Sequence, residues 1–174
     1  WKAMRFWPAA SAGPEGEGFA VRLDGRPVRT PAKRPLILPT QAMAEAVAAE
    51  WAAVGAEVDP RRMPVTRAAN AAIDKVAVQF DEVAAMIAAY GGSDLLCYRA
   101  TGPQALVRAQ AAAWDPMLDW AARTYGARLA VTEGVVPVAQ PAEATARLAA
   151  EVFACSPFQL TALHDLVALT GSLV

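Results

Sequence analysis

Carboxylates, two thiols and one imidazole are the side chains of this sequence that could do chemistry. Asp115 and Asp119 are four residues apart and would share one face of a helix. Paired carboxylates can divide the roles of general acid and general base. Because Asp115 precedes Pro116, we favour the simpler interpretation that Asp115 caps a helix beginning at the proline. A carboxylate-based hydrolase using Asp94, Asp115 or Asp119 stays open as an alternative.

The single histidine and the two cysteines do not form a recognisable site. His164 lies in an apolar helical pattern directly before Asp165, which predicts local packing or hydrogen bonding of its ring. Cys97 and Cys155 are far apart and in no CxxC pairing, so we predict buried thiols in a reducing compartment. No GxxxxGK[ST], GxGxxG or GxSxG string occurs. We therefore predict no catalytic residue, no cofactor and no metal.

Length and composition narrow the class of protein. The chain has 174 residues, 55% of them hydrophobic and 19% charged, with 16 Lys+Arg against 17 Asp+Glu. This balance excludes a disordered chain and a strongly basic nucleic-acid binder. No apolar run approaches the roughly 18 residues that a spanning helix needs, so we expect a soluble protein.

The N-terminal part has the pattern of a small antiparallel sheet. Residues 19–23 alternate apolar and polar and are followed by Asp24-Gly25, a dipeptide that favours a two-residue hairpin turn. Residues 26–29 would form the returning strand, and residues 36–38 another short strand.

From Thr40 onward the apolar period becomes helical. Thr40 can cap a helix over residues 41–54, and Ser156 with Gln159 forms a capping box for the last helix. Arg128–Val131 has the pattern of a short strand. Further helices are predicted over residues 64–78, 81–90, from Pro103 through the Asp115-Pro116 break, and over 141–153. We predict an α+β protein with a β-rich domain, including the first helix, over residues 1–58 and a helical domain over 59–174.

Several short strings, taken in order, resemble one known family. They are Arg5-Phe6-Trp7, Leu23 to Pro31, Leu38-Pro39-Thr40, Glu50-Trp51, Met63 to Thr66, Asp94 to Arg99, Gln110 with Trp114-Asp115-Pro116, and His164 to Val167 continuing through Thr170 to Leu173. The sequence resembles the ATP synthase assembly chaperone that binds the alpha subunit of the catalytic head. The likeness extends over residues 5–173.

The resemblance implies a function without catalysis. Members of this family hold the unassembled alpha subunit and shield the surface that later meets the beta subunit, as an ATP-independent holdase acting by mass action. It also implies a location in bacteria or in the mitochondrial matrix. Arginine outnumbers lysine 13 to 3 and no leader precedes Trp1, so we favour the bacterial cytoplasm. A chaperone of this kind is expected to be a monomer. The family pattern continues with a further helical region after the position of Val174, so we expect the C-terminal domain to be truncated here.

Two groups of residues are candidates for partner contact. The first combines a predicted loop with nearby helical side chains, namely Asp94, Tyr98, Trp114, Asp115 and Trp120. The second is basic: residues 1–35 carry seven basic against three acidic side chains, and Arg22, Arg26 and Arg29 lie on the predicted hairpin. A structural subunit with a permanent apolar interface is the remaining alternative.

Overall fold

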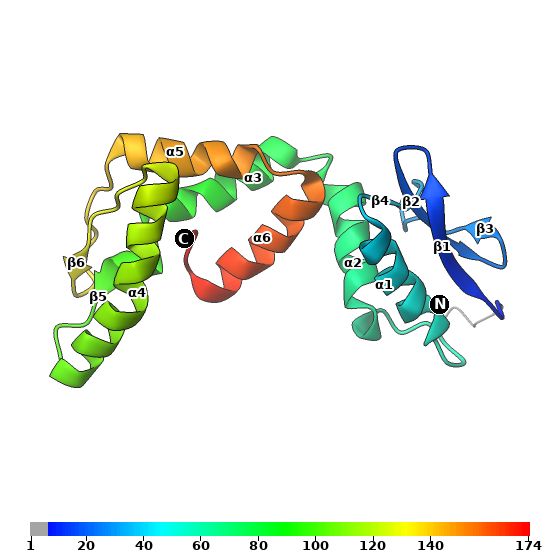
Figure 1. The fold of residues 1–174 in the computed structure, drawn as a ribbon, viewed down its shortest axis with the longest axis horizontal. Helices are drawn as coiled ribbons and strands as arrows, with labels where there is room; N and C mark the ends of the chain where they lie inside the picture. The colour runs from blue at the N-terminus through cyan, green and yellow to red at the C-terminus, as the bar shows by residue number, and fades with distance from the viewer. Residues whose placement is uncertain (1–6) are drawn as a thin grey trace. The chain divides into compact units, whose positions relative to one another are not determined.

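The computed structural model describes residues 7–174 and contains two compact units. The first unit ends at Gln79 and the second comprises Phe80–Val174 (Figure 1). Lys2, Arg5 and Phe6, which contribute to the basic segment and to the first resemblance string, lie outside the described residues. The sequence predicts a boundary between residues 58 and 59, whereas residues 59–79 lie in the first unit of the structure.

The first unit contains the predicted antiparallel sheet. Its strands are β1 (Ala10–Glu15), β2 (Gly18–Leu23), β3 (Arg26–Pro27) and β4 (Ile37–Leu38). β2 is central, with β1 on one side and both β3 and β4 pairing to it antiparallel. Asp24 and Gly25 both have positive φ, which confirms the hairpin turn between β2 and β3. Gly18 is required by close packing, since a Cβ there would lie 2.7 Å from the Leu38 carbonyl oxygen.

Helical segments complete the first unit. They are α1 (Gln41–Ala52), the 3₁₀ turn η1 (Pro60–Arg62), α2 (Pro64–Ala71) and the π-helical turn η2 (Ala72–Val76). The Thr40 side chain accepts from the Met43 N–H, as its cap position predicted. The Glu50 carboxylate, on α1, accepts from the Val65 and Thr66 N–H groups at 2.7 and 2.8 Å, and so fixes the start of α2.

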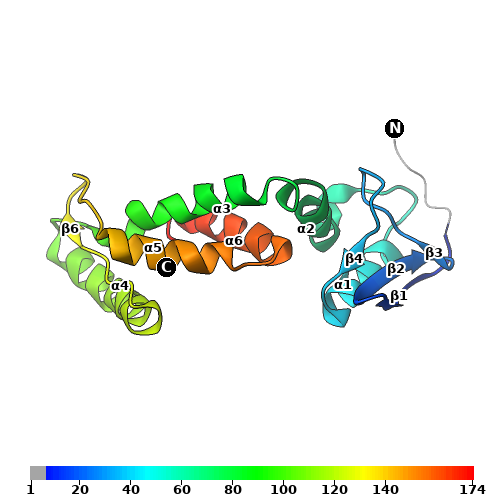
Figure 2. The ribbon, with the colours of Figure 1, turned by 90° about the horizontal axis from the view of Figure 1, so that it is seen from above.

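The second unit is mostly helical. Its elements are α3 (Phe80–Ala88), η3 (Ala89–Gly92), η4 (Leu95–Cys97), β5 (Tyr98–Arg99), α4 (Gln104–Tyr125), β6 (Thr132–Glu133), α5 (Ala142–Phe153) and α6 (Pro157–Thr170). α3 packs against both α5 and α6 (Figure 2). The Ser156–Gln159 capping box at the start of α6 is present as predicted. None of the helices within residues 7–174 combines the length and apolar character needed to cross a membrane.

Two local predictions in the second unit are wrong. α4 does not begin at Pro116 but runs continuously through it, and Asp115 does not cap a helix. The helix tolerates Pro116 because the Ala112 carbonyl, which cannot accept a hydrogen bond from the proline nitrogen, belongs to an exposed residue and can bond to water. Residues 128–131 form no strand, since the Gln140 side chain occupies both the N–H and the carbonyl of Ala130, at 2.7 and 2.9 Å.

A buried apolar cluster holds the second unit together beside the C-terminal half of α4. Leu118 of α4 packs there with residues of η4, the 126–130 segment and α5, and Tyr98 and Trp114 pack against its edge. The buried members are Leu96, Cys97, Leu118, Ala127, Leu129, Ala144 and Leu148. This cluster therefore positions the elements that carry the helical group of predicted contact residues.

Candidate functional site

Arg99 is a buried cation at the centre of the predicted helical contact group. Its Nε donates to the Leu96 carbonyl oxygen at 2.7 Å, and a terminal guanidinium nitrogen lies 2.8 Å from the Asp115 carboxylate. The guanidinium also lies over the Trp114 ring, 5.3 Å from its centroid. A buried charge needs such partners because its desolvation is costly. Arg99 therefore joins η4 to α4.

Arg99 is not among the contact residues predicted from the sequence. The sequence does contain one indication of its role: Arg99 directly follows the apolar string Leu95 to Tyr98, and a charge next to buried side chains needs a counter-charge. A second link runs in parallel, since the Gln110 side-chain oxygen accepts from the Ala100 N–H at 2.8 Å. Together they fix α4 against β5.

The structure places the five predicted helical contact residues in different environments. Asp94 is fully buried, and Tyr98 and Trp114 are half-buried against the apolar cluster. Asp115 is 58% exposed and Trp120 is 44% exposed, so these two can be reached by a partner. The structure thus gathers Trp114 and Asp115 around Arg99, while Trp120 packs edge-on against Tyr125, with ring centroids 5.3 Å apart.

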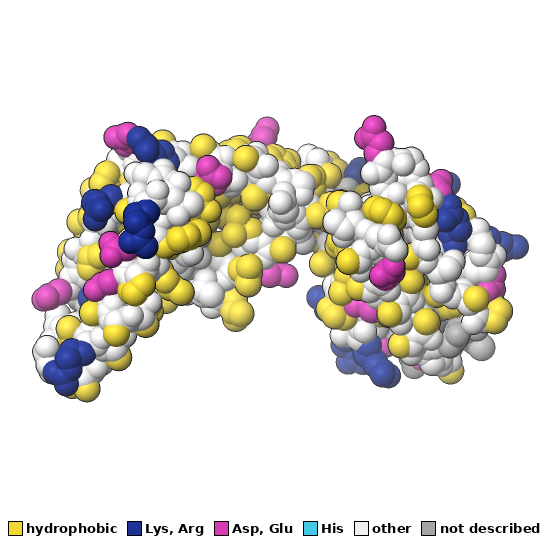
Figure 3. All heavy atoms as spheres, in the orientation of Figure 1, with side chains coloured by type: hydrophobic (Ala, Val, Ile, Leu, Met, Phe, Trp, Pro, Cys, Tyr) yellow, Lys and Arg dark blue, Asp and Glu magenta, His cyan; other side chains and the backbone are white. Residues whose placement is uncertain are grey.

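α4 has an exposed face without charge. In this fully described helix of 22 residues only Leu118 and Ala121 are buried. At 100° per residue one exposed stripe contains Leu106, Ala109, Ala113, Met117 and Trp120. Apolar side chains reach the surface along α4 in Figure 3. We call these five residues the α4 stripe; a solvated helix would carry polar side chains at such positions.

Three of the four charged residues of α4 lie away from the stripe. Arg108, Asp115 and Asp119 are about half a turn around the helix from Ala113, whereas Arg123 is about a quarter turn from it, at the edge of the stripe. The buried residues Leu118 and Ala121 lie between the stripe and this charged face. A helix with one buried face and a second apolar face is typical of a protein that binds a partner.

The basic hairpin residues Arg22, Arg26 and Arg29 lie in the first unit and differ in whether their side chains already have a partner. Arg22 is ion-paired with Glu15, and Arg29 donates to the Lys33 carbonyl oxygen at 2.9 Å. Arg26 is exposed at the start of β3 and has no ion pair with any described residue. Of the three arginines, Arg26 is therefore the one whose charge is most available to a partner.

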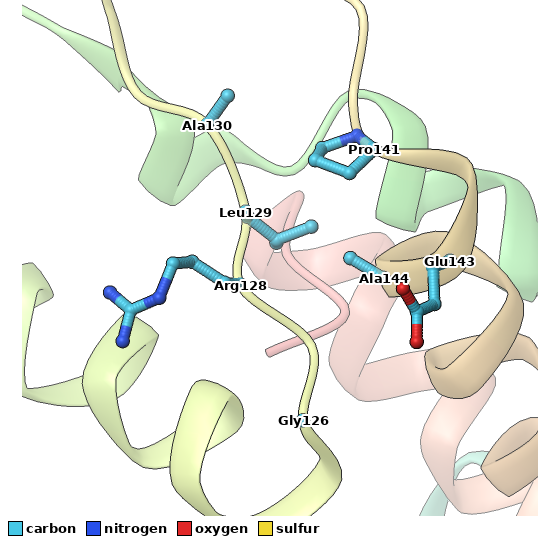
Figure 4. A pocket seen from close by; sticks show the side chains of 7 residues that line it. All are labelled: Gly126, Arg128, Leu129, Ala130, Pro141, Glu143 and Ala144. Atoms are coloured by element: carbon cyan, nitrogen blue, oxygen red, sulfur yellow. The ribbon is translucent and has the colours of Figure 1, made fainter.

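The second unit also holds an open groove of about 420 Å³. It lies between the segment that follows α4 and the start of α5, and Figure 4 shows its lining side chains. The lining residues are Gly126, Arg128, Leu129, Ala130, Pro141, Glu143 and Ala144. None of the carboxylates proposed for a hydrolase lines this groove. Within residues 7–174 no group of three or more His, Cys, Asp or Glu side chains could hold a metal ion.

His164 and the thiols have local roles. His164 Nδ1 lies 3.1 Å from the carboxylate of its neighbour Asp165, which agrees with the predicted local hydrogen bond. Burial, with a smaller effect of the Asp94 carboxylate, raises the pKa of the Cys97 thiol to about 11. Cys97 is therefore protonated at neutral pH and a poor nucleophile.

The fold combines a small antiparallel sheet with a helical unit whose α4 helix presents an exposed apolar stripe, and such stripes are typical of proteins that bind other proteins. Comparison with known proteins places the chain more closely: the sequence profile described as "ATP12 chaperone protein" matches residues 4–122. The chain belongs to the ATP12 family of ATP synthase assembly chaperones.

Solved structures of related proteins have the same fold. Atp12 from Paracoccus denitrificans is 58% identical, with a TM-score of 0.94, and the match covers 98% of this chain and 73% of that one. A single-residue mutant of the same protein gives a TM-score of 0.95 at the same identity and coverage. A protein of Agrobacterium tumefaciens is 44% identical, with a TM-score of 0.91, over 99% of this chain and 65% of that one.

Proposed function

We propose that this chain binds the unassembled alpha subunit of the ATP synthase catalytic head and prevents its aggregation before ring assembly. Membership of the ATP12 family supports a role in assembly of this enzyme. The resemblance in the strings from Leu23 to Leu173 supports the alpha subunit as the partner. We place this activity in the bacterial cytoplasm, and we propose that the chain acts as a monomer without ATP.

The observation that carries this proposal is the α4 stripe. Leu106 and Trp120 are each 44% exposed and Met117 is 50% exposed, along one side of a helix that Arg99 holds in place. An unassembled subunit exposes apolar surface that will later be buried between subunits, and such surface aggregates. Covering it with the α4 stripe lowers the concentration of the aggregating species by mass action.

The geometry gives no support to a carboxylate-based hydrolase. Both oxygens of Asp94 accept internal hydrogen bonds, and Asp115 is ion-paired with Arg99. A catalytic pair would instead face a common cavity.

Light scattering of denatured alpha subunit, diluted with and without an equimolar amount of this chain, tests the proposal. We expect scattering to fall and a one-to-one complex to elute from gel filtration, without added ATP. Bovine serum albumin at the same mass concentration controls for non-specific protection. Unchanged scattering with no complex would show that this chain does not hold the alpha subunit.

A further inference from the structure

We propose that the groove beside Arg128 binds an extended segment of the client protein in which an apolar side chain adjoins an acidic one. This inference rests on the proposed function, since it assigns a subsite to the same client. The groove begins where α4 ends, at Gly126, and is separate from the α4 stripe. Its chemistry is set by an apolar floor and a basic rim.

The floor of the groove is apolar and preformed. Leu129 and Ala144 are buried members of the apolar cluster and point toward each other in Figure 4, with Pro141 beside them. Because these side chains are fixed by the core, the groove needs no rearrangement to accept an apolar side chain. A volume of about 420 Å³ accommodates one or two such side chains of a peptide, but is small for a packed helix.

The rim carries an excess of positive charge. Glu143 lies at the edge of the groove and is paired with Arg147 at 2.5 Å, so its charge is balanced. Arg128 is exposed and has no ion pair or hydrogen bond with any described residue. In Figure 4 the Arg128 side chain points away from Glu143. An acidic side chain of a ligand would complement Arg128.

The backbone at the groove favours an extended ligand. Gly126, with φ of 66°, ends α4, and the chain then passes the first turn of α5. Ala130 is bonded to Gln140, whereas the N–H and carbonyl groups of Arg128 and Leu129 have no partner among the described residues. An extended segment can pair with such free backbone groups while its alternate side chains point to opposite sides. Leu129 and Arg128 point to opposite sides in the same way.

Charge reversal at Arg128 tests this assignment in the intact chain. We expect Arg128→Glu to raise the Kd for the alpha subunit at least tenfold, and Arg128→Lys, which keeps the charge, to restore most of the affinity. Arg67→Glu is the matched control, because Arg67 is an exposed arginine of α2 in the first unit. Its Kd should stay within twofold of the wild type. Thermal unfolding of each variant checks that the fold is retained.

Fluorescence anisotropy with labelled 12-residue peptides that tile the alpha subunit supplies the second readout. The tightest peptides should contain a Leu, Ile, Val or Phe next to an Asp or Glu, and should lose affinity when that acid is replaced by lysine. If the wild type holds the alpha subunit and Arg128→Glu holds it equally well, the groove assignment is wrong and the proposed function stands. If neither the subunit nor any peptide binds, both are overturned. Self-association abolished by Arg128→Glu, with no effect on peptide binding, would instead assign the groove to a second copy of the chain.

Discussion

The carboxylate of Asp94 accepts a hydrogen bond from the backbone N–H of Leu173 at 2.7 Å, joining positions 79 residues apart. The same oxygen accepts from the Ser172 hydroxyl and from the Val174 N–H, each at 3.0 Å. The other oxygen accepts from the Leu96 N–H at 2.9 Å and caps η4. Asp94 thus holds the segment after α6 against the start of η4, close to the cluster that supports α4.

We predict that Asp94→Ala lowers the free energy of unfolding of the second unit by about 2–3 kcal/mol, because it leaves the buried Leu96 N–H and three half-buried donors of residues 172–174 without their acceptor. Urea unfolding followed by circular dichroism measures this loss. Asp119→Ala is the control, since Asp119 is an exposed α4 carboxylate with no hydrogen bond or ion pair to a described residue, and should change stability little. Equal stability of the two variants would contradict the role assigned to Asp94.

The Arg99–Asp115 ion pair leads to a prediction about binding. Asp115 is 58% exposed, but its loss leaves the buried Arg99 guanidinium without its counter-charge, so we expect a stability cost of about 2 kcal/mol. We also expect a Kd for the alpha subunit at least tenfold higher for Asp115→Ala, because Arg99 and Trp114 lose their fixed position beside the α4 stripe. Isothermal titration calorimetry and thermal unfolding separate the two effects. A lower melting temperature with unchanged Kd would remove Asp115 from the binding surface.

Local chemistry accounts for the features that the sequence predicted well. The Asp24-Gly25 turn, the Thr40 cap and the Ser156–Gln159 capping box each depend on a few adjacent residues. The α+β class was also predictable from local sequence, because the spacing of apolar residues changes near Thr40 from the alternation of a strand to the period of a helix. Such signals are independent of the rest of the fold and can be read from one sequence.

Tertiary partners account for what could not be predicted. The position of Asp115 before Pro116 predicts a helix cap. In the structure the Asp115 carboxylate instead forms an ion pair with Arg99, 16 residues earlier, and α4 continues through the proline. Likewise, the Gln140 side chain bonds to the backbone of Ala130, so this residue does not form the strand predicted from its neighbours. Burial of Asp94 depends on residues 172–174, which only folding of the second unit brings close. Local propensity depends only on neighbouring residues, so it does not predict contacts with these distant groups.

Trp120 gives a direct test of the α4 stripe. We predict that Trp120→Ala raises the Kd for the alpha subunit at least tenfold, because half-exposed aromatic side chains contribute strongly to protein interfaces. Phe153→Ala is a matched control, since Phe153 at the end of α5 is an aromatic residue with the same 44% exposure. Surface plasmon resonance of both variants gives the comparison. An equal loss of affinity in both would show that general surface hydrophobicity, and not the α4 stripe, binds the subunit.

Cys97 reports on the folding of the second unit. Its thiol is fully buried, as predicted, with a pKa raised to about 11. The prediction of a buried Cys155 is wrong, since that thiol is partly exposed, with a pKa that partial burial raises. Between the unfolded pKa of about 8.5 and the folded value of about 11, the unfolded chain releases the Cys97 proton first. The contribution of Cys97 to stability is therefore constant below that window and decreases as pH rises through it.

We accordingly predict that Cys97→Ala reduces the loss of unfolding free energy between pH 8.5 and pH 10.5, as measured by urea titrations at each pH. The Cys155→Ala variant is the reference, because it keeps the buried thiol. In native protein at pH 8, iodoacetamide should modify Cys155 well before Cys97, with both reacting rapidly in urea, because alkylation requires an accessible thiolate. Rapid native labelling of Cys97 would mean that the cluster around Leu96 and Leu118 opens far more readily than its burial implies.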